Sequence, residues 1–107
     1  MNAMICETER ATGAAAVSMT VAPGRDWVLE EVRVHLSAAG GAANLTITID
    51  AGAGAAYDYT LATQDMTSVT NYTYQPTRPI NLSSGDKILI AWANGSTRTY
   101  GIEVKYR

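Results

Sequence analysis

Residues 80–106, which read I-N-L-S-S-G-D-K-I-L-I-A-W-A-N-G-S-T-R-T-Y-G-I-E-V-K-Y, decide the fold class. Apolar residues alternate with polar ones on both sides of Asn94-Gly95, at Ile88, Ile90 and Trp92 and again at Tyr100, Ile102, Val104 and Tyr106. Successive side chains of a strand point to opposite faces, so each set lines one surface. Because Asn-Gly tolerates the positive φ angles of a tight turn, this stretch predicts two antiparallel strands joined by a short hairpin.

The same two-residue period recurs along the rest of the chain, and no segment has a convincing helical pattern. Strands are expected at about residues 15–22, 27–37, 44–50, 57–61, 69–75, 80–82, 87–93 and 98–107. Pro76 and Pro79 have no N–H to donate to a ladder, so the strand before them is expected at a sheet edge. Short strands at this spacing predict an all-β fold, an antiparallel β-sandwich of about eight short strands with a jelly-roll-like topology.

The segment 27–37 needs a local irregularity to fit this scheme. Its first apolar residues, Trp27 and Leu29, have the opposite parity to Val32 and the apolar residues after it. A β-bulge near Glu30-Glu31 would place both sets on the same face, because one extra residue resets the alternation. A helix is the competing interpretation of W-V-L-E-E-V, but the β-branched residues that follow and the absence of a good N-cap favour a strand.

Length and composition limit the organisation and the partners of the chain. The 107 residues correspond to one domain, and we expect an N-terminal arm over residues 1–13 followed by a single sandwich over residues 14–107. A net charge of −2 and scattered Lys and Arg residues give no electrostatic footprint for nucleic acid. No apolar run reaches the roughly 18 residues of a membrane helix, and the first residues do not resemble a secretory signal. Cys6, the single cysteine, cannot form an intramolecular disulfide.

Few residues could carry chemistry. His35, the single histidine, has the opposite parity to Val34 and Leu36, so it is expected to face solvent as an ordinary strand residue. Four carboxylates lie in or beside turns, at Asp50, Asp58, Asp65 and Asp86. Such loops can bind calcium, but no D-x-D-x-D pattern is present, and Asp at turns commonly accepts hydrogen bonds from backbone N–H groups. We therefore expect no catalytic residue, no metal and no cofactor.

The aromatic residues are tyrosines and tryptophans, because the chain has no phenylalanine. We expect Trp92, Tyr100 and Ile102 in the core, whereas Tyr72 and Tyr74 lie in a polar strand where exposure and burial are equally compatible with the sequence. The loop A-G-A-G-A-A precedes a strand and not a helix, which excludes a phosphate-binding loop. Four N-x-S/T sequences are expected to be coincidental, since no secretory signal is visible.

Two non-enzymatic classes remain. One is a structural module of a larger assembly, which the low charge, the small-residue loops and the arm favour. The other is a non-catalytic carbohydrate-binding β-sandwich module that uses tyrosines and turn carboxylates. The two differ in whether the aromatic side chains form a coplanar platform, which a sequence does not display.

The run Leu82-Ser-Ser-Gly-Asp-Lys-Ile-Leu-Ile-Ala-Trp resembles the L-x-x-G-D-x-I-x-I turn and strand of many jelly-roll sandwiches. In size, arm and Thr/Ala/Gly-rich composition, the whole chain resembles the small β-sandwich decoration (cement) proteins of tailed-phage capsids. That resemblance implies a bacteriophage virion protein, made in the host cytoplasm, that forms a homo-oligomer (dimer or trimer). It would bind the major capsid protein or another virion protein and stabilise the assembled shell.

The resemblance carries no residue-level site to this chain, so the candidates for protein contact come from the residues alone. They are the arm residues Met4, Ile5 and Cys6, together with Tyr72 and Tyr74. We expect no contact with nucleic acid or with a membrane.

Overall fold

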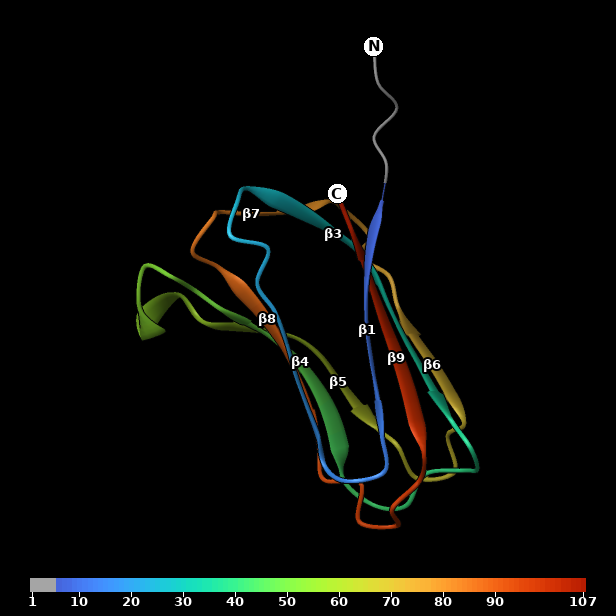
Figure 1. The fold of residues 1–107 in the computed structure, drawn as a ribbon. Coiled ribbons are helices and arrows are strands. Elements are labelled where there is room, and N and C mark those ends of the chain that lie inside the picture. Colours follow the sequence, from blue (N-terminus) through green and yellow to red (C-terminus); the bar gives the residue numbers. More distant parts are fainter. Residues whose placement is uncertain (1–5) are drawn as a thin grey trace.

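A computed structural model describes residues 6–107, which fold into two antiparallel sheets packed face to face (Figure 1). The elements, in chain order, are β1 (Glu7–Gly13), β2 (Val17–Val21), β3 (Trp27–Leu36), β4 (Asn44–Asp50), the 3-10 turn η1 (Ala55–Tyr57), β5 (Tyr59–Asp65), β6 (Asn71–Tyr74), β7 (Ile80–Leu82), β8 (Lys87–Trp92) and β9 (Tyr100–Tyr106). The predicted all-β antiparallel sandwich is therefore confirmed.

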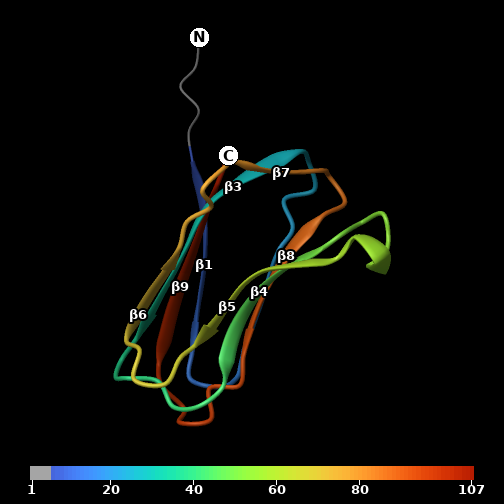
Figure 2. The same cartoon turned by 180° about the vertical axis from the view of Figure 1, so that it is seen from behind.

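The strand order identifies a jelly roll. One sheet, here sheet A, has the order β1-β9-β3-β6, with β7 also paired to β3; the other, sheet B, has the order β2-β8-β4-β5. Strands that follow one another in the chain mostly lie in opposite sheets, as the two views from front and back show (Figures 1 and 2). Among the described strands, β4 and β5 are the only consecutive pair that form a hairpin.

Strands β6 and β7 are two pieces of one interrupted strand. Both pair with β3, β6 through Val32–His35 and β7 through Trp27–Leu29. The segment between them contains Pro76 and Pro79, which cannot donate to the ladder. The predicted edge strand and the predicted break are both confirmed, and the nine observed strands correspond to eight positions of the sandwich.

The predicted bulge in β3 is also confirmed. Leu29 pairs with Tyr106 and Glu31 pairs with Lys105, so Glu30 is the extra residue. Its side chain lies beside the chain end, where it accepts a hydrogen bond from Arg107 Nε. On either side of the bulge the apolar residues face the same way, and all of them are buried: Trp27, Leu29, Val32, Val34 and Leu36.

The core between the sheets is built from the inward-facing residues of both sheets. Sheet B contributes the alternating residues of β2, β4 and β8, among them Met19, Ile47 and Ile90, which are almost fully buried. Trp92 and Ile102 lie in this core as predicted, while Tyr100 is half-buried against its margin. The rings of Trp27 and Tyr106 meet edge to face with centroids 5.3 Å apart, which closes the core at one end.

The prediction of a tight hairpin at Asn94-Gly95 is wrong. Strand β8 pairs with β2 and β4 in sheet B, whereas β9 pairs with β1 and β3 in sheet A, so the connection crosses from one sheet to the other. Asn94 does adopt a positive φ of 50°, as its residue type permits, but Thr97 also has a positive φ of 52°. The local turn signal was correct, but local sequence does not specify which sheet a strand joins.

The buried side chain of Asn94 holds this crossing together. Its amide nitrogen donates to the carbonyl oxygens of Ala15 and Arg98, both at 2.9 Å, and its amide oxygen accepts the N–H of Arg98 at 2.9 Å. The bond to Ala15 ties the loop between β1 and β2 to the loop between β8 and β9. One side chain therefore fixes two crossings between the sheets at the same end of the sandwich.

The prediction of a loose arm over residues 1–13 is wrong for residues 7–13. They form β1, which pairs with β9 from Glu7↔Tyr106 to Gly13↔Tyr100. The sequence does not indicate this strand, because its residues, E-T-E-R-A-T-G, are polar and small, and Ala11 is the one apolar residue with which this edge strand packs against the core. Residues 1–5, with the contact candidates Met4 and Ile5, lie outside the described residues.

We predict that Asn94→Asp destabilises the fold by about 2–3 kcal/mol, because a carboxylate cannot donate to the two carbonyl oxygens and leaves buried groups without partners. Urea denaturation followed by circular dichroism measures the effect. The exposed Asn81→Asp makes the same chemical change at a surface position and should cost under about 0.5 kcal/mol. Equal losses for the two variants would contradict the assigned role of Asn94.

Candidate functional site

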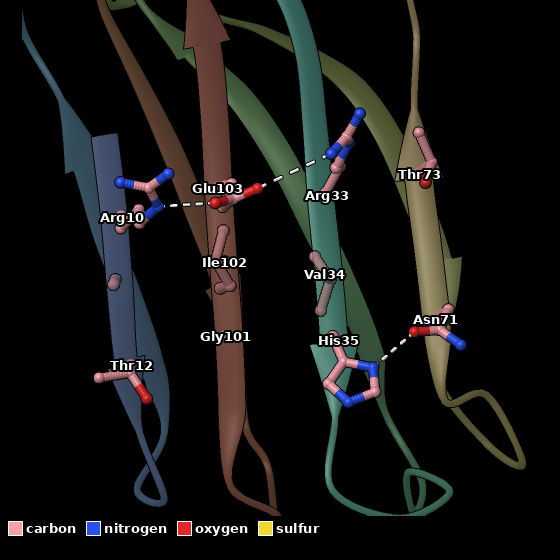
Figure 3. A pocket seen from close by; sticks show the side chains of 11 residues that line it. Arg10, Thr12, Arg33, Val34, His35, Asn71, Thr73, Gly101, Ile102 and Glu103 are labelled. Atoms are coloured by element: carbon pink, nitrogen blue, oxygen red, sulfur yellow. Dashed lines mark hydrogen bonds and ion pairs between the residues drawn. The ribbon is translucent and has the colours of Figure 1, made fainter. Parts of the chain in front are cut away.

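A shallow hollow of about 650 Å³ lies on the outer face of sheet A, across β1, β9, β3 and β6 (Figure 3). The antiparallel register sets four residues from these strands side by side in the order Thr12, Gly101, His35 and Asn71. All four are exposed. Because Gly101 has no side chain, the row has a gap at its centre, which we call the Gly101 hollow.

A second row of charged residues borders the Gly101 hollow. Glu103 lies between Arg10 on β1 and Arg33 on β3, with Arg10 Nε donating to Glu103 Oε2 at 2.6 Å and Arg33 Nη1 at 3.8 Å from Glu103 Oε1. Arg33 Nε also donates to Glu31 at 2.9 Å. The hydrogen bond from Arg10 lowers the pKa of Glu103, and the charges of Arg10, Lys105 and Arg33 lower it further against the opposing effect of burial. Glu103 is therefore ionised near neutral pH.

His35 lies on the other side of the hollow and faces solvent, as predicted. Its Nδ1 is 2.6 Å from Asn71 Oδ1. Since an amide oxygen only accepts hydrogen bonds, Nδ1 carries the proton, and in the neutral ring Nε2 is an acceptor. Asn71 keeps its two amide N–H donors. The neighbouring hydroxyl of Thr12 donates to the carbonyl oxygen of Tyr100 at 2.8 Å, which leaves its oxygen lone pairs available as acceptors.

The second candidate surface is the hairpin that joins β4 to β5. Residues 51–58 project beyond the sandwich, as both ribbon views show (Figures 1 and 2). They contain no Lys, Arg or Glu, and their tip is formed by the η1 turn. Tyr57 and Tyr59 have exposed fractions of 69% and 66%, and they are the two large apolar residues that the described chain leaves exposed. We call this segment, including Tyr59, the tyrosine hairpin.

Two aspartates fix the direction of the tyrosine hairpin. Asp58 Oδ1 accepts the N–H of Ala51 at 2.9 Å across its base. Asp86, in the turn before β8, accepts the N–H of Gly52 at 3.0 Å and the N–H of Ser83 at 2.9 Å. A Cβ on Gly52 would lie only 2.7 Å from the carbonyl oxygen of Gly85, so this close approach requires a glycine. The hairpin is therefore held in place before any partner binds.

Three of the four turn carboxylates, Asp58, Asp86 and Asp65, accordingly have structural roles. Asp65 likewise accepts the N–H of Thr67 at 3.0 Å and its hydroxyl at 2.7 Å. These hydrogen bonds lower the pKa of Asp65 and of Asp86 below the ordinary value of 3.8. Within residues 6–107, no group of three or more His, Cys, Asp and Glu side chains is arranged to hold a metal ion.

The predicted contact residues that the structure describes, Cys6, Tyr72 and Tyr74, lie in separate places, since β1 and β6 are the opposite edges of sheet A. Cys6 is exposed at the start of the described chain. Tyr72 and Tyr74 pair with Val34 and Val32, so they share the inward face of sheet A, where they are half-buried against the core at its edge. Burial raises the pKa of the Tyr74 phenol, and the nearby Tyr59 raises it further. The tyrosines of β6 are thus partly core.

Few features of the sequence predict either surface. Tyr57 was expected at the start of a strand, but it lies in the η1 turn, and β5 begins at Tyr59 and extends to Asp65 through its pairing with Asn44. The one available signal was the uncharged loop A-G-A-G-A-A before the tyrosines. A loop of such small residues has no large apolar side chain to place in the core. The Gly101 hollow joins residues from Thr12 to Gly101 in the chain, and only the strand order brings them together.

Comparison with known proteins adds no family: no protein-family model matches the chain, and no curated protein matches it significantly. Among the described residues, no helix has the length and apolar character needed to cross a membrane.

We predict that the fold loses stability in acid partly through Asp86. Its pKa is lower in the folded than in the unfolded chain, so its contribution is complete above the ordinary value of 3.8 and is lost as the pH falls through the folded-state pKa. The urea midpoint should therefore fall between about pH 6 and about pH 3. Asp86→Asn should lower the midpoint at pH 6 and flatten this pH dependence.

Asp50→Asn, at another strand end, is the matched control for that experiment. In this control variant, the urea midpoint should change with pH as steeply as it does in the wild-type chain. An Asp86→Asn variant with an unchanged slope would show that the hydrogen bonds from Gly52 and Ser83 do not link folding to protonation.

Proposed function

We propose that this chain is a non-catalytic structural protein of a phage virion, a capsid decoration protein that binds the assembled shell and stabilises it. The observation that carries the proposal is the tyrosine hairpin. A preorganised projection with two exposed aromatic rings, whose one charged residue is Asp58 at its base, is suited to protein contact, since tyrosine is enriched in the buried centres of protein interfaces and charged residues are depleted there.

Preorganisation supports this use of the hairpin. Asp58 and Asp86 hold its base through backbone hydrogen bonds, so little conformational entropy is lost when the tyrosines are covered. The two tyrosine rings can therefore contact a protein surface with little loss of conformational entropy.

The resemblance to decoration proteins supplies the partner class, which is the major capsid protein or another virion protein. A protein that binds the assembled shell and not the free subunits stabilises the shell by mass action. In the manner of that family, the chain would form a dimer or trimer. One such oligomer would then contact more than one capsid subunit. Its place is the virion, after synthesis in the host cytoplasm.

The test uses shells assembled from the major capsid protein encoded by the genome that encodes this chain. We expect the purified chain to co-sediment with the shells at a saturable stoichiometry, to raise the temperature at which they disassemble, and not to bind free capsid subunits. The double variant Tyr57→Ser, Tyr59→Ser should bind at least about tenfold more weakly, the loss expected for truncating interface tyrosines.

Thr20→Ala, at an exposed position of β2, is the matched surface control and should bind like the wild-type chain. Circular dichroism verifies that the double variant is folded. The proposal is overturned if the wild-type chain does not bind the shells, if the genome encodes no capsid protein, or if the folded double variant binds as tightly as the wild type.

We also predict that the chain elutes from a sizing column as a discrete dimer or trimer when its mass is measured by light scattering. In decoration proteins, symmetric contacts between copies provide several shell-binding surfaces at once, which raises the overall affinity. A monomeric mass at all concentrations up to the millimolar range would contradict the oligomer and leave shell binding to a single weak contact.

A further inference from the structure

Gly101 is a glycine that the fold does not require. It lies inside β9, between β1 and β3, and its pairing is continuous on both sides, with Thr12 and with His35. It does not have the positive φ that Gly24 and Gly54 have. A Cβ built on it would meet no atom within 4 Å. A glycine inside a strand weakens the strand and commonly marks a place where a ligand approaches the backbone closely.

We propose that the Gly101 hollow binds a saccharide unit that carries one carboxylate. This site is distinct from the tyrosine hairpin, which belongs to sheet B, whereas the hollow lies on the outer face of sheet A. Its volume of about 650 Å³ lies within the roughly 300–1,000 Å³ of small-ligand pockets.

The donors and acceptors around the hollow match vicinal hydroxyl groups. A hydroxyl both donates and accepts, so it needs mixed partners. The hollow supplies acceptors at Glu103, at the Thr12 oxygen and at His35 Nε2, and it supplies donors at the Asn71 amide and the arginines (Figure 3). The backbone at Gly101 lets the flat face of a sugar ring lie against the sheet, because no side chain intervenes.

The charges around the hollow favour one carboxylate on that saccharide. Arg10 binds Glu103 through Nε, and its side chain has an exposed fraction of 69%, so its terminal N–H groups are accessible. A second carboxylate can bind there in the same geometry. Arg33 is already paired with Glu31, so Arg10 is the arginine whose terminal N–H groups a carboxylate on the ligand would meet. The ionised Glu103 repels a ligand with several negative charges, such as a phosphate ester, more strongly than one with a single charge, and it accepts hydrogen bonds from hydroxyl groups.

The experiment titrates the isotope-labelled full chain with three saccharides that each carry one carboxylate: galacturonate, glucuronate and sialyllactose. Backbone NMR signals of Gly101, His35 and Asn71 should shift saturably with at least one of them. The methyl ester of that same saccharide, which keeps the hydroxyls and loses the charge, should bind about tenfold more weakly, because charge-assisted hydrogen bonds are about twice as strong as neutral ones. Inorganic phosphate should not shift these signals.

Gly101→Val is the decisive variant, because it places a side chain at the centre of the hollow, where a Cβ meets no atom within 4 Å. It should raise the melting temperature of the chain, since a β-branched residue replaces a glycine within a strand, and it should abolish the binding. Gly95→Ala, where a Cβ also meets nothing within 4 Å, adds a side chain away from the hollow and should bind like the wild type.

The proposal is overturned if none of the three saccharides shifts the signals, if the ester or phosphate binds as tightly as the acid, or if the folded Gly101→Val variant keeps the wild-type affinity. These outcomes are independent of shell binding, which depends on Tyr57 and Tyr59.

Discussion

The bulge at Glu30 is the constraint on which the rest of the sandwich depends. Strand β3 pairs with β9, β6 and β7, so it is the centre of sheet A, and it can bury both of its apolar segments only if one extra residue resets the alternation. Without that residue, either Trp27 and Leu29 or the apolar residues from Val32 onward would face water. The same register sets the positions of the neighbouring strands. It therefore also sets the row formed by Thr12, Gly101, His35 and Asn71 on the outer face.

The connections between the sheets depend on a few polar groups and glycines. Asn94 joins the loops at one end of the sandwich by three hydrogen bonds, and Asp86 joins the tyrosine hairpin to the turn before β8. The close contact of Gly52 with Gly85 is explained by this packing, since a side chain at Gly52 would meet the opposite backbone. Gly101 has no such explanation inside the molecule. Gly52 is thus required by the packing of the fold, whereas Gly101 is the glycine that we assign to a surface site.

The two candidate surfaces differ in physical character. The tyrosine hairpin is aromatic and projecting, with Asp58 as its one charged residue, which suits contact with another protein. The Gly101 hollow is concave and lies between charged side chains, with hydrogen-bond donors and acceptors on four strands. Because one belongs to sheet B and the other to sheet A, a single copy of the chain can use both without competition. A decoration protein with this arrangement would bind a shell through the hairpin and present a saccharide site on another face.

The sequence by itself determined the strands, because alternation of apolar residues is a local property: residues 44–50 were predicted at their observed bounds, and the bulge near Glu30 and the break at Pro76 and Pro79 followed from the pattern. It did not reveal β1, whose polar residues at a sheet edge have no alternation to detect. Only the tertiary structure decided that the strands beside Asn94 belong to different sheets, since a turn sequence specifies backbone angles and not pairing partners. It alone brought Thr12, His35, Asn71 and Gly101 into one row, because residues so distant in the chain become neighbours only through the register of four strands.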